Sequence, residues 1–201
     1  MGIWDKINTA TSVVDLIEKL AEDDTTQPTQ PTSPPSEPEP TESSSSQPVP
    51  TDTSPTLPDF PSGNIVVKDI NYLQTRVKVF ALAALEECKS KYEITIVESY
   101  RTPERQDTLY GQGRTEAGNV VTNAQRMESY HNYGLALDIT PVNDEIVDIF
   151  ENNGFEWGGR WKSLKDTPHF QISFGLKISD LKKLYSQNGM QSVWDYIGYE
   201  N

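Results

Sequence analysis

Cysteine and histidine are scarce in this sequence. Its 201 residues include one cysteine and two histidines. A single cysteine excludes a disulfide framework within the chain. Because Cys88 falls in an apolar pattern, we expect a small buried side chain and not a reactive thiol. The two histidines, His131 and His169, stand out as candidates for chemistry.

Long apolar runs and clusters of positive charge are also missing. No segment reaches transmembrane length, and the first twenty residues lack the basic start and apolar run of a secretory signal peptide. The net charge of -13 divides into -9 over residues 1–60 and -4 over residues 61–201, without any run of Lys or Arg. We therefore expect no nucleic-acid partner, and we expect synthesis in the cytoplasm without a signal peptide.

Proline is concentrated in one stretch, and this predicts the domain organisation. Eleven of the fourteen prolines lie between Thr25 and Pro61, among Thr, Ser, Gln and Glu. Such a composition buries too little apolar surface to offset the entropy of ordering, so residues 25–61 are predicted to be a disordered linker. Residues 62–201 are an ordinary size for one globular domain.

The segment ahead of the linker, residues 1–24, is predicted to form an amphipathic helix. Its apolar residues recur at steps of three and four: Ile3, Trp4, Ile7, Ala10, Val13, Val14, Ile17, Leu20 and Ala21. Two interpretations are open: the helix folds back onto the main domain, or it docks into a groove of another protein. A membrane is disfavoured because the polar side of the helix is acidic.

The main domain mixes helical and strand patterns. Helices are predicted from the N-cap Asp69 to about Lys91, from Thr102-Pro103 to about Tyr110, over 142–153, and around Leu181 and Val193. Strands are predicted over 93–98, 135–140 and 169–174. The fold class is therefore α+β, with a small antiparallel sheet.

Two imidazoles and a carboxylate in this domain match the ligand set of a catalytic zinc site. Such a site takes three protein ligands and keeps one position open for water, and His131, Asp138 and His169 supply this set. Gly134 would permit a turn after His131, and strand alternation would turn Asp138 away from the core. Asp166 is the predicted general base, with Glu156 as a weaker candidate.

The motifs around these residues resemble those of the zinc D-alanyl-D-alanine carboxypeptidases and phage L-alanyl-D-glutamate endolysins, and the endolysins more closely. The resemblance covers most of residues 65–175. The similar segments are Ser99-Tyr-Arg101-Thr, Gln106, Leu109 to Thr115, Val121 to Ala124, Ser129 to Asp138, Gly154 to Gly159, and the stretch up to His169-Phe170.

The resemblance implies a D,D-peptidase-like fold, shared with Hedgehog signalling domains, with zinc ligands at His131, Asp138 and His169 and a catalytic Asp166. It also implies that Arg101 binds a substrate carboxylate or stabilises an oxyanion. Gln106 and Ser129 would bind the substrate backbone or orient a ligand imidazole.

Four further residues near these motifs bear on the substrate. Arg160 and Gln171 depart from the family's pattern, which often has acidic residues there, and so affect substrate preference. Trp157 and Trp161 either wall the cleft or pack structurally.

The expected function is zinc-dependent cleavage of a peptidoglycan stem peptide. The spacing of the motifs favours the L-alanyl-D-glutamate bond, and the alternatives are a D,D-carboxypeptidase or an inactive zinc-stabilised binding module. Without a signal peptide, the enzyme would reach the cell wall after phage lysis or on a tail or injection particle to which the N-terminal helix docks.

Overall fold

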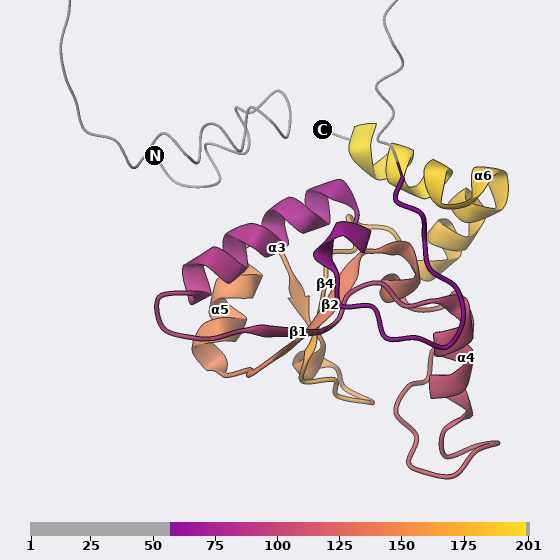
Figure 1. Ribbon diagram of the computed structural model, residues 1–201, viewed down its shortest axis with the longest axis horizontal. Coiled ribbons are helices and arrows are strands. Elements are labelled where there is room, and N and C mark those ends of the chain that lie inside the picture. Colours follow the sequence, from indigo (N-terminus) through magenta and orange to yellow (C-terminus); the bar gives the residue numbers. More distant parts are fainter. Residues whose placement is uncertain (1–56, 200–201) are drawn as a thin grey trace, which may run out of the picture. The chain divides into compact units, whose positions relative to one another are not determined.

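The computed structural model describes residues 57–199, and these form a four-stranded antiparallel sheet with helices (Figure 1). The strands are β1 (Thr95–Glu98), β2 (Ala136–Thr140), β3 (Glu156–Trp157) and β4 (His169–Gln171), in the spatial order β1-β2-β4-β3. All three pairings are antiparallel. The predicted α+β class is confirmed.

The helices are α3 (Thr75–Cys88), α4 (Pro103–Gly111), α5 (Asp144–Asn152) and α6 (Ile178–Tyr199), with short 3-10 turns η2 (Ile70–Tyr72), η3 (Tyr130–Tyr133) and η4 (Gly158–Arg160). Thr102 caps α4 by accepting from the Arg105 amide, and proline follows as the first helical residue, as predicted. In the described part of the chain, no helix is long and apolar enough to cross a bilayer.

The predicted helix from Asp69 to Lys91 is wrong over its first six residues, 69–74, because α3 begins only at Thr75. Asp69 caps only the short turn η2, and the chain is extended at Leu73 and Gln74 before α3 begins. The cause is a long-range contact, because the Gln74 amide donates to the Gly134 carbonyl at 2.9 Å. The Gln74 side chain then caps α3 by accepting from the Arg76 amide at 2.7 Å.

The sheet has one apolar face and one polar face. Leu137 and Phe170 lie opposite each other on β2 and β4 and are fully buried, and the Phe170 ring lies 4.7 Å from that of Phe150 on α5. The neighbouring pair, Asp138 and His169, points to the other face. The core therefore lies between the sheet and α5 with α3, and the polar face is left for a site.

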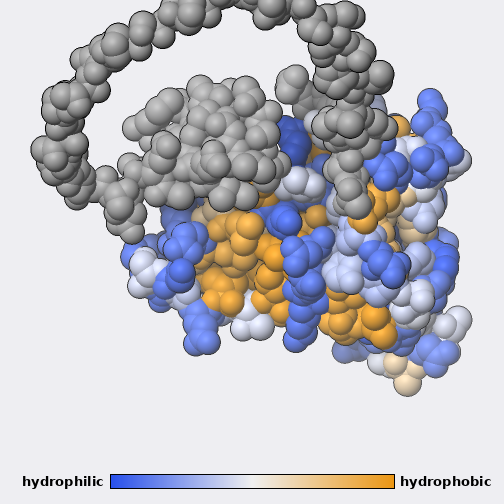
Figure 2. Space-filling view, turned by 45° about the horizontal axis from the view of Figure 1, so that its top comes forward, coloured by the Kyte–Doolittle hydropathy of each residue, from blue (hydrophilic) through white to orange (hydrophobic). Residues whose placement is uncertain are grey.

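The two helical stretches predicted around Leu181 and Val193 form α6, which bends at Asn188 and Gly189. Leu181, Val193 and Trp194 are buried, so this element completes the core. The visible surface in Figure 2 carries apolar areas broken up by hydrophilic side chains.

The predicted helix at 1–24 and most of the predicted linker lie outside the described residues. The described part begins five residues before the expected boundary at Ser62. There Phe60 packs against Tyr100, with ring centroids 4.8 Å apart, and edge-on against Trp194.

Candidate metal site

The three predicted ligands come together at the polar face of the sheet, although only two of them lie on strands. Asp138 is on β2 and His169 on β4, whereas His131 is in η3. Gly134 ends η3 in the left-handed conformation with a φ of 69°, and a Cβ there would lie 2.6 Å from the Tyr72 carbonyl oxygen. The predicted turn thus depends on glycine for both conformation and space.

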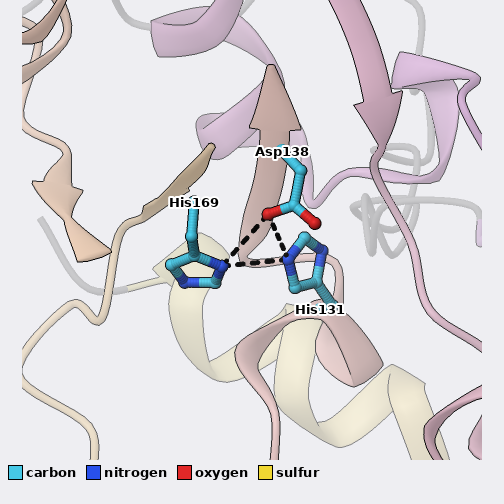
Figure 3. Close-up of side chains that lie close together, drawn as sticks. All are labelled: His131, Asp138 and His169. Carbon is cyan, nitrogen blue, oxygen red and sulfur yellow. Dashed lines mark hydrogen bonds and ion pairs between the residues drawn. The ribbon is translucent and has the colours of Figure 1, made fainter. Parts of the chain in front are cut away.

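The ligand atoms lie close enough to share one ion (Figure 3). His131 Nε2 lies 3.0 Å from His169 Nδ1, and the Oδ1 atom of Asp138 lies 3.1 Å and 3.3 Å from these two nitrogens. Ligands on one tetrahedral zinc at about 2.1 Å lie about 3.4 Å apart. The separations fit a zinc ion.

The tautomer of His131 is set by its backbone partner. His131 Nδ1 lies 2.7 Å from the Ser99 carbonyl oxygen, which can only accept, so this nitrogen carries the proton. Nε2 therefore presents a lone pair. Burial lowers the pKa of His131, so the ring is neutral near pH 7.

His169 is oriented by a relay of side chains. The Glu156 carboxylate accepts from Gln171 Nε2 at 3.3 Å, which turns Gln171 Oε1 toward His169 Nε2 at 3.0 Å. Nε2 of His169 then donates, and Nδ1 is left with a lone pair.

Lone pairs from both rings and from Asp138 Oδ1 consequently face the same point. None of these three atoms carries a proton that it could donate to the other two, so their lone pairs repel one another. A cation bound between them would relieve this repulsion. The donor set therefore fits a zinc ion in protonation as well as in distance.

Arg101 lies beside this cluster and is already heavily engaged. Its Nε donates to Glu98 at 2.7 Å, Nη2 contacts Asp138 Oδ2 at 3.2 Å, and Nη1 donates to Gln106 at 3.3 Å. Arg101 thus fixes the outer oxygen of Asp138 and leaves Oδ1 toward the histidines. Arg101 also lines both clefts, and its expected contact with a substrate carboxylate or an oxyanion stays a prediction.

Glu98 was not identified as a site residue from the sequence. It is buried and binds both Arg101 and Arg105. A β-bulge between Ile96 and Glu98 brings Glu98 opposite Asp138 on the polar face. The signal available in the sequence was an acidic residue ending an apolar strand, three residues before Arg101.

Gln106 and Ser129 form hydrogen bonds with residues of the cluster or next to it. Gln106 is fully buried, and its amide donates to the Ala124 carbonyl at 2.6 Å while its oxygen accepts from Arg101. It has no surface for a substrate, so of its two expected roles only indirect positioning remains. Ser129 caps η3 and accepts from the His131 amide at 3.3 Å, and it also lines a cleft.

Asp166 lies where two clefts meet. One cleft, of about 310 Å³, runs past His169 and Ser129, and the other, of about 440 Å³, runs past Glu98 and Asp138. Asp166 lines both. Burial, followed by the charge of Asp138, raises its pKa, which suits a carboxyl that takes and returns protons.

Glycine lets the Asp166 segment approach the sheet. A Cβ on Gly158 would lie 2.7 Å from the Asp166 carbonyl oxygen and 3.0 Å from the His169 Cβ. The Asp166 amide also donates to the Gly158 carbonyl at 3.2 Å. Any side chain at Gly158 would displace Asp166 or His169.

The two tryptophans and Arg160 differ in their positions relative to the clefts. The Trp161 ring lies 4.9 Å from that of His169 and lines a cleft, whereas Trp157 donates to the Thr167 carbonyl. Arg160 pairs with Glu151 at 2.7 Å through two nitrogens and lines neither cleft. Glu156, the weaker candidate for the base, binds Gln171 and Ser173 and lines neither cleft.

Fold and site together define a small α+β domain that carries a buried His-Asp-His cluster able to hold a metal ion. Residues 122–172, which include this cluster and Asp166, match the family model described as D-alanyl-D-alanine carboxypeptidase. The resemblance inferred from the motifs is thereby confirmed.

Two curated relatives extend the match. The peptidoglycan L-alanyl-D-glutamate endopeptidase of Bacillus subtilis (strain 168) is 41% identical over an alignment of 101 residues, and the match covers 40% of this chain and 60% of the relative. The L-alanyl-D-glutamate peptidase of a Listeria phage is 32% identical over 122 residues, covering 53% of this chain and 40% of the relative. The chain spans less than two thirds of the length of either protein.

Among solved structures, the Serratia marcescens L-Ala D-Glu endopeptidase has a TM-score of 0.40 at 22% identity, covering 55% of this chain and 92% of that one. An LD-carboxypeptidase structure has a TM-score of 0.42 at 17% identity, covering 71% and 77%. At these scores the similarity adds nothing about function.

Proposed function

We propose that the chain is a zinc-dependent peptidase of bacterial peptidoglycan that hydrolyses the L-alanyl-D-glutamate bond of the stem peptide. The observation that carries the proposal is the convergence of three lone pairs, from His131, Asp138 and His169, beside a carboxyl with a raised pKa. The choice of bond is supported by the names of the two curated relatives.

His131, Asp138 and His169 would hold the ion. A zinc ion supplies a Lewis acid that polarises a carbonyl group and lowers the pKa of a bound water. Asp166, at the junction of the clefts, accepts the proton from the attacking water and returns it to the leaving amine. Arg101 keeps Asp138 in place through Oδ2.

The direct test is mass spectrometry of purified peptidoglycan after digestion by the zinc-loaded protein. New L-alanine carboxyl ends and D-glutamate amino ends are the expected products. Release of terminal D-alanine would instead identify a carboxypeptidase, in line with the description of the matching family model. The absence of any product would support a zinc-stabilised binding module.

The role of Asp166 has its own test. Asp166→Asn should lower kcat by about 10²- to 10⁴-fold, the usual contribution of a general base, and leave the zinc content unchanged. Asp148→Asn is a matched control, because Asp148 is an exposed acidic residue of α5 that lines neither cleft. An Asp166→Asn protein with unchanged kcat would refute the assignment of the base.

Delivery to the wall by phage lysis, or on a tail or injection particle bound by residues 1–24, is part of the same proposal. Deleting residues 1–56 should leave the hydrolysis of soluble muropeptides unchanged. It should also abolish co-purification with the particle. A loss of hydrolysis on soluble fragments would contradict the role of the segment as a tether.

A further inference from the structure

The two clefts that meet at Asp166 differ in charge. Both include Arg101 in their lining, but the cleft along β1 adds two more cations, Lys68 and Arg105. The cleft along His169 adds no further Lys or Arg among the described residues, and it contains Glu128. The β1 cleft holds as many Lys and Arg as Asp and Glu side chains, because Glu98, Asp138 and Asp166 also line it, whereas carboxylates outnumber Lys and Arg in the cleft along His169. An anion is therefore better tolerated on the β1 side.

Arg101 is not the best candidate to bind an anion in this cleft, because its guanidinium group already contacts three side chains. Its Nε and Nη2 bind Glu98, Nη2 also contacts Asp138, and Nη1 donates to Gln106. Arg105 shares the same Glu98 carboxylate, with its Nε 3.3 Å from Oε1. Glu98 and Asp138 thus pair with the two guanidinium groups, and Lys68 is left as the cation of this cleft without an ion pair among residues 57–199.

Lys68 is the cation best placed to bind a ligand in this cleft. It is exposed, and no carboxylate among residues 57–199 forms an ion pair with it. Its position is nevertheless fixed, because the carbonyl of the preceding Val67 accepts from the Ser99 amide at 2.7 Å. Ser99 in turn holds His131 through its own carbonyl.

The rest of the cleft is apolar and suits a short aliphatic stem. Its apolar lining residues are Val66, Val97, Leu109 and Val121. Val66 and Val97 are 47% and 37% exposed, so their side chains are accessible to a ligand in this cleft. A methylene chain that ends in a carboxylate would complement both the valines and Lys68.

We propose that the cleft along β1 binds the acidic residue of the substrate, with its free carboxylate on Lys68. This inference rests on the proposed function. A D-glutamate within a peptide has two carboxyl groups, and linkage to the next residue leaves the other one free. The D-glutamate side of the scissile bond then lies along β1, and the alanine side lies along His169.

The test compares two stem peptides that differ only at that group, one with the free carboxylate and one with the carboxamide. Lys68→Ala should raise KM for the carboxylate peptide by about threefold to tenfold and leave its kcat nearly unchanged. The same variant should cleave the carboxamide peptide as the wild type does. Lys68→Arg should restore most of the lost selectivity, because it restores the charge.

Lys183→Ala is the matched control, because Lys183 is an exposed lysine of α6 outside both clefts. An equal effect of Lys68→Ala on both peptides, or no effect on either, would overturn the assignment while the peptidase activity stands. Cleavage of neither peptide by the wild type would refute the proposed function. In that case calorimetric binding of the two peptides to wild type and Lys68→Ala still decides whether Lys68 selects the carboxylate.

Discussion

The two histidines of the site have the same task but are held in different ways. His131 is fully buried, and its ring is fixed by a backbone carbonyl, that of Ser99. His169 is fixed by a side chain, Gln171, which is itself oriented by Glu156. A backbone partner cannot be changed by a point mutation, whereas a side-chain relay can. One ligand is therefore invariant in its tautomer, and the other can be tuned by mutation.

The largest difference should appear when each histidine is removed. His131→Ala and His169→Ala should both lose the ion, measured as zinc content after dialysis. Only His131→Ala should also weaken the chelator-treated protein strongly, because it leaves the Ser99 carbonyl buried without its partner and opens a cavity in the interior, at a cost of about 2–5 kcal/mol. Denaturant titration measures this cost. Equal losses in the two variants would remove the distinction between the ligands.

A second prediction tests the relay directly. Gln171→Leu should lower zinc affinity by about 10- to 100-fold, the usual effect of losing a group that orients a ligand imidazole. The stability of the chelator-treated protein should change far less than in His131→Ala. Competition with a chromogenic chelator measures the affinity. An affinity equal to that of the wild type would show that His169 needs no partner.

A glutamate at position 171, which is common in the family, gives a more specific test of the relay from Glu156 to His169. Gln171→Glu keeps an acceptor for His169 but places a second carboxylate beside Glu156. Repulsion should raise the pKa of one of the pair and weaken zinc binding toward acid pH. Adding Glu156→Gln should restore the affinity, and a failure to restore it would contradict the coupling.

The sequence predicted the site better than it predicted the local structure around it. Alternation along β2 correctly turned Leu137 inward and Asp138 outward, because one strand's own residues settle that question. The bulge that brings Glu98 opposite Asp138 depends on pairing between strands, and the break before α3 depends on a bond from Gln74 to Gly134. Local patterns do not encode such long-range contacts. The two-residue β3 is too short for any periodicity.

Substrate-side roles were harder to predict for a related reason. The sequence motifs drew attention to Arg101 and Gln106, which the structure places in a closed network around Asp138. Lys68 lies in none of the motifs that carried the family resemblance, although it falls within residues 65–175. Only the position of residues 66–68 beside Ser99 brings it to the cleft.

A pH titration should show a smaller effect that again singles out His131. Its pKa in the folded protein lies below the ordinary value of 6.5 because of burial. Below that pH the unfolded chain binds a proton that the folded chain does not, so stability is fully present above about 6.5 and falls as the pH drops. Denaturation midpoints of the chelator-treated protein between pH 7.5 and 5.5 should fall, and His131→Gln should flatten this slope. An unchanged slope would assign the effect to other groups.

The smallest effect is expected for Glu156→Ala, at the outer end of the relay. Glu156 is exposed and is connected to the His-Asp-His cluster only through Gln171 and His169. Without it the Gln171 amide is free to flip and present its NH₂ to His169, which would force the imidazole toward the tautomer that cannot bind metal through Nδ1. Solvent can replace much of the lost contact, so zinc affinity should fall by about threefold or less, well short of Gln171→Leu. An equal loss in the two variants would mean that Gln171 has no orientation of its own, and that the tautomer of His169 is set by Glu156.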